Sequence, residues 1–165
     1  TLTKNLPRGL LSFEVIDSYS GLPMPSRLTF YYADDRVNIP TVGRFKNVIP
    51  SSSGHQTISI PTGQYHVYVS RGSEYTLDFH DIRVTEGEIT HLNSTLSRVV
   101  DTTGFISSDF HVHLQRDLSD GVVISAAEGL DLFTALHRDA PNISSSAEGC
   151  LLYGEAGVLA SRGQV

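Results

Sequence analysis

The first hundred residues alternate between hydrophobic and polar positions in short segments that turn residues separate. In residues 64–71, Tyr65, Val67 and Val69 fall on one side of an extended chain and the residues between them fall on the other. Such alternation is typical of a strand with one buried face. The segments that predict strands are residues 9–17, 27–33, 56–60, 64–71, 75–84 and 89–100. Residues 34–55 are polar and interrupted by proline and glycine, which predicts a long loop. Several short strands of this kind predict a mainly β protein, a β-sandwich.

The pattern changes after residue 100. Residues 105–114 predict a strand, residues 122–129 a helix that ends at Gly129, and residues 130–136 a second, buried strand. A strand, a helix and a strand in this order open an α/β architecture. We therefore predict a sandwich over residues 1–100, an α/β segment over residues 101–139 and an irregular or disordered tail over residues 140–165.

Composition and charge then exclude two classes of function. The chain has 39% hydrophobic and 18% charged residues and a net charge of -6, without a basic cluster. We therefore predict no nucleic-acid partner. No apolar run approaches the ~20 residues of a membrane helix, so we expect no membrane span. The single cysteine, Cys150, has no partner for an internal disulfide.

Two histidines, His111 and His113, stand two positions apart in the predicted strand over residues 105–114. Residues i and i+2 of a strand share one face, so both imidazoles can reach one metal ion. Imidazole suits zinc, iron and manganese. Asp109 precedes the pair, and Asp117 and Asp120 follow it, which brings carboxylates close in sequence. The alternative interpretation is a polar strand face that holds no metal.

The residues around this pair resemble a known family. The segments GFISSDFHVHL and SAAEGLDLFTAL resemble the opening of a polymerase-and-histidinol-phosphatase (PHP) domain. The earlier segments GLPMPSRLTF and IPTGQYHVYVSRG resemble the sandwich that precedes it in CehA/McbA-type metallohydrolases. The resemblance runs over residues 9–136. It implies a transthyretin-like (carboxypeptidase-regulatory-like) β-sandwich followed by the truncated β-α-β opening of a PHP (β/α)7 barrel.

The resemblance also implies a metal site. His111 and His113 match the first metal-binding pair of the family, and Asp109 matches the acidic residue before it. The implied cofactor is a divalent metal, zinc or manganese. Such an ion polarises an ester or phosphoester oxygen and activates water, so the implied partner is a small-molecule ester or phosphoester substrate.

Two further residues are weaker ligand candidates. Asp120 stands near the place of a loop carboxylate in the family. After the second strand the family has Thr-Asp-His, where this sequence has Leu136-His137-Arg138. His137 therefore ligates only if the alignment slips by one residue, and its alternative interpretation is a solvated loop histidine. Arg138 would repel a cation.

Two functions stay open. One is the N-terminal fragment of a divalent-metal hydrolase that acts on phosphoester or carboxylic or carbamate ester bonds. The other is a non-catalytic β-sandwich accessory or binding module with a degenerate remnant of the metal domain. Residues 105–165 are too few for a (β/α) barrel of roughly 200 or more. We therefore expect a truncated, frame-shifted or otherwise partial chain without the remainder of the barrel, with a poorly packed C-terminal third and no catalysis of its own. The resemblance also implies an extracytoplasmic location, periplasmic or secreted.

The sandwich holds other candidates with two interpretations each. His66 is predicted on the solvent face of its strand. His80 beside Asp81 is either part of a ligand pair or one side of a cross-strand hydrogen bond. Tyrosines are frequent in this region, either as an aromatic binding surface or because aromatic residues favour strands. They are Tyr31, Tyr32, Tyr65, Tyr68 and Tyr75.

Overall fold

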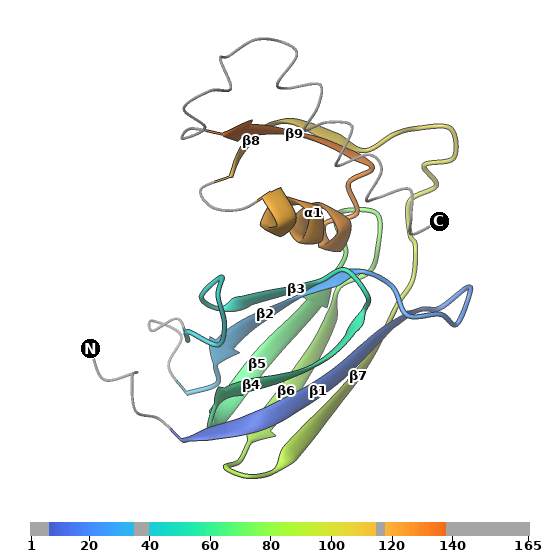
Figure 1. The fold of residues 1–165 in the computed structure, drawn as a ribbon. Helices are drawn as coiled ribbons and strands as arrows, with labels where there is room; N and C mark the ends of the chain where they lie inside the picture. The colour runs from blue at the N-terminus through green and yellow to red at the C-terminus, as the bar shows by residue number, and fades with distance from the viewer. Residues whose placement is uncertain (1–6, 35–39, 115–117, 138–165) are drawn as a thin grey trace.

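The protein consists of a two-sheet sandwich, one helix and a further pair of strands (Figure 1). The structure, a computed structural model, describes residues 7–34, 40–114 and 118–137, and for residues 110–114, 118–119 and 133–137 it describes the backbone. The tail predicted over residues 140–165, with Cys150, lies outside the described residues, as do Asp117 and Arg138. The elements are β1 (Arg8–Asp17), β2 (Ser26–Tyr32), β3 (Val48–Ser51), β4 (His55–Pro61), β5 (Gly63–Ser70), β6 (Asp78–Val84), β7 (Ile89–Leu96), β8 (Ser108–Leu114), α1 (Leu118–Ala127) and β9 (Leu132–His137).

The sandwich predicted from the alternation is confirmed by the two sheets. One has the strand order β4-β1-β7, in which β1 is antiparallel to β4 and parallel to β7. The other has the order β3-β2-β5-β6, and all its neighbours are antiparallel. Their inner faces form one hydrophobic core.

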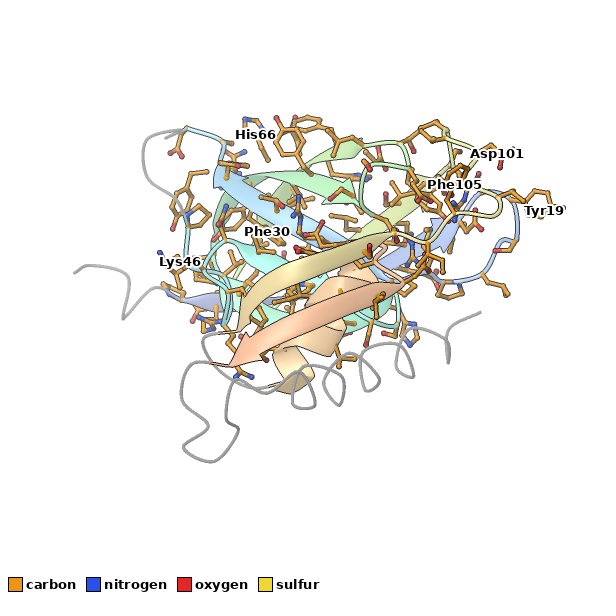
Figure 2. All side chains as sticks on the ribbon, turned by 90° about the horizontal axis from the view of Figure 1, so that it is seen from above. Tyr19, Phe30, Lys46, His66, Asp101 and Phe105 are labelled. Carbon is orange, nitrogen blue, oxygen red and sulfur yellow. The ribbon has the colours of Figure 1, made fainter. Side chains whose placement is uncertain are left out.

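The core is built from the alternate positions that the sequence marks as apolar. Phe30 of β2 meets the ring of Tyr65 of β5 edge-on, with ring centroids 6.0 Å apart, and Tyr32 stacks on the same tyrosine. The buried Tyr65 hydroxyl donates a hydrogen bond to the carbonyl of Pro61 at 2.9 Å, so burial of this ring leaves no polar group unpaired. Figure 2 shows Phe30 inside the molecule. Val67 and Val69 complete the inner face of β5.

The expectation of a loop throughout residues 34–55 is wrong, because β3 lies within it. This strand has four residues, and Pro50 stands opposite Arg27 of β2. Proline is tolerated here because β3 is at the edge of its sheet, where an N–H on the outer side has no strand to pair with. A short strand with proline carries the same sequence signals as a loop.

Several predicted boundaries also move. The strand predicted over residues 75–84 begins at Asp78, and Tyr75 forms only an isolated bridge with Arg98. The strand predicted over residues 89–100 ends at Leu96, and the one predicted over residues 105–114 begins at Ser108.

The predicted strand–helix–strand unit is present, with β8 parallel to β9. The helix starts four residues earlier than predicted, because the acidic Asp120 is accommodated in its first turn, where it complements the helix dipole. The helix ends at the predicted glycine cap, where Gly129 has φ 71°. The amide of Gly129 donates to the carbonyl of Ala126, and the amide of Leu130 donates to the carbonyl of Ser125. This is a Schellman cap. Among the described residues, no helix is long and apolar enough to cross a membrane.

The last turn of α1 is held against the sandwich by Arg71. Its Nη1 donates to the carbonyl oxygens of Pro25, at 2.9 Å, and Ala126, at 3.4 Å. Burial lowers the pKa of Arg71, and its guanidinium also lies over the ring of Tyr75. The neighbouring Gly72 approaches the helix so closely that a Cβ there would lie 2.3 Å from the carbonyl oxygen of Glu128.

Two ion pairs extend this contact along the helix. Arg27 of β2 pairs with Glu128, and Nη2 of Arg44 lies 2.7 Å from Oδ2 of Asp120. Ala127 is fully buried. The expectation of a poorly packed C-terminal third is therefore wrong for α1, which lies between the sandwich and the β8–β9 pair (Figure 1).

Gly72→Ala tests how α1 docks. Both Gly72 (φ 55°) and Gly87 (φ 74°) occupy the left-handed region, so an alanine at either costs about 1–2 kcal/mol. Only an alanine at position 72 would also displace α1, because nothing lies within 4 Å of a Cβ built at Gly87. We expect Gly72→Ala to accelerate hydrogen exchange of the amides at 124–128, and Gly87→Ala to leave them unchanged. Equal exchange of these amides in both variants would contradict the described docking.

Candidate functional site

The predicted metal ligands lie on the two parallel strands outside the sandwich. His113 stands opposite Leu136 of β9, and His137 stands opposite Leu114 of β8. All three predicted histidine ligands therefore belong to one strand pair, and His113 and His137 lie toward its carboxyl end. In parallel α/β sheets this end is where ligands bind.

The pairing is not regular at His111. Asp109 pairs with Phe133 and Val112 pairs with Ala135, with a register shift between these pairs. The shift is a β-bulge, and His111 lies inside it. The rule that residues i and i+2 share a face holds for the regular part of β8, after the bulge. It therefore does not by itself place His111 and His113 on one face. Bulges are common beside active sites because they change the direction of a side chain.

The weaker candidate ligands lie elsewhere. His137 is the last residue of β9 and is not a register partner of His113. Asp109 is exposed near the start of β8. Asp120 is on α1 rather than in a loop, and its carboxylate pairs with Arg44. Its ligation of a metal would have to compete with this arginine.

The residues present fit a divalent metal only in part. Neutral imidazole is a common metal ligand that suits zinc, whereas manganese prefers the oxygens of carboxylates and water. Among the residues whose side chains the structure describes, no group of three histidine, cysteine, aspartate or glutamate side chains could hold an ion. Metal ligation at His111 and His113 stays a prediction.

Two of the sandwich histidines, His66 and His80, pair with aspartates. His66 Nδ1 contacts Asp81 Oδ1 across β5 and β6, where the two residues are register partners. His66 is thus on the outer face, as predicted, and a cross-strand contact holds it there. His80 does not pair with its sequence neighbour Asp81. Its Nε2 lies 2.8 Å from Oδ2 of Asp78.

Asp78 joins the two sheets at the edge where β6 and β7 meet. The hydroxyl of Ser94 on β7 donates to its Oδ2 at 2.7 Å, and the backbone amide of Phe79 donates to its Oδ1 at 2.9 Å. Burial raises the pKa of Asp78, but the hydrogen bonds from Ser94, Phe79 and His80 outweigh burial and leave the pKa below its usual value. The cluster is explained as a structural bridge between sheets.

A groove lies on the outer face of β2, β5 and β6. Register places its residues in rows: Tyr31 is opposite His66, and Thr29 is opposite Tyr68, which is opposite Phe79. The groove has a volume of about 570 Å³ and extends to Arg27, Ser70 and Leu77. Figure 2 shows His66 at the periphery of the molecule, whereas Phe30 is in its interior.

The rings of this groove contact one another. Tyr31 and Tyr68 meet edge-on with centroids 5.9 Å apart, Tyr68 lies 5.1 Å from Phe79, and His66 lies 5.5 Å from Phe79. The tyrosines of β2 and β5 thus divide between two faces, with Tyr31 and Tyr68 in the groove and Tyr32 and Tyr65 packed in the core, whereas Tyr75 lies against Arg71 and Arg98. Phe79 was not predicted as a member, although its outward position in an alternating strand was the available signal.

The chain resembles known proteins only weakly. No family profile matches it, and no curated protein is detectably similar. Among solved structures, the minor pilin GBS52 of Streptococcus agalactiae matches with 15% identity and a TM-score of 0.47, over 58% of this chain and 47% of its own. The major pilin subunit BcpA of Bacillus cereus matches with 19% identity and a TM-score of 0.46, over 56% of this chain and 30% of its own. The 5-hydroxyisourate hydrolase of Klebsiella pneumoniae matches with 16% identity and a TM-score of 0.38, over 55% of this chain and 85% of its own.

This chain therefore spans less than half of the length of either pilin structure. Likenesses at this level carry no conclusion about activity or location. The class that the chain's own sheets define is a two-sheet β-sandwich with a β-α-β unit docked on it.

Asp78→Asn tests the bridge between the sheets. Because the pKa of Asp78 is lowered in the folded protein, its carboxylate stabilises the fold above the ordinary aspartate pKa of about 3.9. This stability is lost as the pH falls through the lower pKa of Asp78 in the folded protein. We expect the variant to be less stable than the unmodified chain at pH 7, and the difference to shrink below about pH 4. Urea unfolding across this pH range measures it. The exposed Asp34→Asn serves as the control, and a difference for Asp78→Asn that does not change with pH would contradict the assignment.

Proposed function

We propose that the β8–α1–β9 unit is the first part of a divalent-metal hydrolase of the PHP type, and that the sandwich is its accessory domain. The observation that carries this proposal is the parallel pairing of β8 with β9, which gathers His111, His113 and His137 on one strand pair next to the helix that follows β8. In α/β proteins the carboxyl ends of parallel strands are the usual place for a site.

His111 and His113 would hold the ion, zinc or manganese, with Asp109, Asp120 and His137 as weaker candidates. A bound divalent ion would polarise an ester or phosphoester and lower the pKa of water. The substrate class is therefore a small phosphoester or a carboxylic or carbamate ester. Two imidazoles do not complete a catalytic zinc site, which has three protein ligands, so we propose metal binding without turnover for this chain. The family resemblance also leads us to propose an extracytoplasmic location.

The alternative proposal is a non-catalytic accessory or binding module with a degenerate metal domain. The aromatic groove on the outer face of the sandwich favours it, because a module that only supported a barrel would have no use for exposed rings gathered at one place.

Metal analysis separates the two proposals. The purified chain, dialysed against zinc or manganese and then against buffer, is expected to retain close to stoichiometric metal by mass spectrometry. The double variant His111→Ala/His113→Ala is expected to retain about tenfold less, since two ligands are lost. The matched control is His55→Ala/His91→Ala, which removes two exposed sandwich histidines and should retain the metal. An unmodified chain without metal would rule out the hydrolase proposal and leave the binding module.

A further inference from the structure

The outer-face groove combines three properties that together specify a ligand. The first is exposed apolar surface at one place. Tyr68, Phe79 and Leu77 keep 36%, 45% and 64% of their surface accessible, although each lies on or beside a strand of the sandwich. Exposed rings that gather in this way mark binding surfaces, and a volume of about 570 Å³ is within the range of small-ligand pockets.

The second property is charge. Of the residues that line the groove, Arg27 and His66 are the basic ones, and each already has an acidic partner. Arg27 pairs with Glu128, and His66 pairs with Asp81. The groove therefore offers no uncompensated charge to a phosphate or an ammonium group, and charge complementarity favours a neutral ligand.

The third property is hydrogen-bonding capacity around the rings. Thr29 and Ser70 supply hydroxyl groups, each of which both donates and accepts. Nδ1 of His66 contacts Asp81, which leaves Nε2 as a polar ring atom without a partner among the described residues. A ligand that stacks on the rings meets donors and acceptors at its rim.

We propose that this groove binds a neutral saccharide. The C–H face of a sugar ring packs on an aromatic ring, while its hydroxyls bond to polar groups at the side. The groove lies on the face of the sheet, and the main-chain groups of β5 at its centre are already bonded to β2 and β6, so an extended peptide lying over β5 finds no main-chain groups to pair with. The inference concerns the sandwich alone and is independent of the metal site, which lies on β8 and β9.

The experiment uses the full chain and neutral hexasaccharides of glucose, mannose, galactose or N-acetylglucosamine, each titrated by calorimetry. We expect saturable binding to at least one of them. Phe79→Ala and Tyr68→Ala are expected to weaken it about tenfold each, because each removes a stacking ring. Phe79→Tyr retains the ring and should stay within about threefold of the unmodified chain.

The matched control is Tyr19→Ala, which removes a tyrosine that is 97% exposed and lies at the end of the molecule away from His66 (Figure 2). It should bind as the unmodified chain does. Circular dichroism melting of each variant separates lost binding from lost folding.

Three outcomes overturn the proposal. One is the absence of saturable binding to every hexasaccharide. A second is binding that Phe79→Ala and Tyr68→Ala leave unchanged, which would place the saccharide elsewhere. The third is that the chain binds no saccharide but associates with itself or captures a polyproline decamer, and that Phe79→Ala abolishes this binding. The result of the metal analysis has no bearing on any of these outcomes.

Discussion

Neighbouring residues of a strand send their side chains to opposite sides of the sheet, and in β2 and β5 this pleat separates the core from the outer groove by one position. Phe30 belongs to the core, and Tyr31 belongs to the groove. Val67 and Tyr68 divide in the same way. A slip of β2 by one residue against β5 would bury Tyr31 and expose the ring of Phe30. The core therefore fixes the register, and the fixed register determines which side chains line the groove.

The same two strands also position the α/β unit. Arg27 lies on the outer face of β2 and reaches Glu128, while Arg71 follows β5 directly and reaches the last turn of α1. Because both arginines leave the sandwich at fixed register positions, the sheet that carries the groove also fixes one end of the helix. The contact depends on Gly72, since any side chain there would meet the carbonyl of Glu128. The ion pair of Arg27 with Glu128 is partly exposed to solvent and contributes little energy by itself. The more buried Arg71 hydrogen bonds and the burial of Ala127 contribute more to this contact.

The features of the fold and of the candidate sites that could be predicted from the sequence are those set by residues adjacent in the chain. The strands with long alternating runs and the helix end at Gly129 are local, and their sequence signals identified them. β3 is short and contains Pro50, so only its partner β2 makes it a strand. The contact of Asp120 with Arg44 joins distant segments, and the bulge at His111 arises from pairing with β9. Neither has a sequence signal. To predict the groove, one would need the register between β5 and β6, which brings Phe79 beside Tyr68.

The position of α1 also limits how the two proposed sites relate to each other. The groove extends to Arg27, whose partner Glu128 follows the C-terminal end of the helix. The carboxyl end of β8 at Leu114 leads within a few residues to the opposite end, at Leu118. A helix of 10 residues separates these ends by about 15 Å. A small ester is shorter than this helix, so we expect the groove and the histidines to act independently on such a ligand. Only a chain-like ligand that spans the length of α1 could occupy both, and it would gain affinity from the groove without any contribution of the groove to the chemistry.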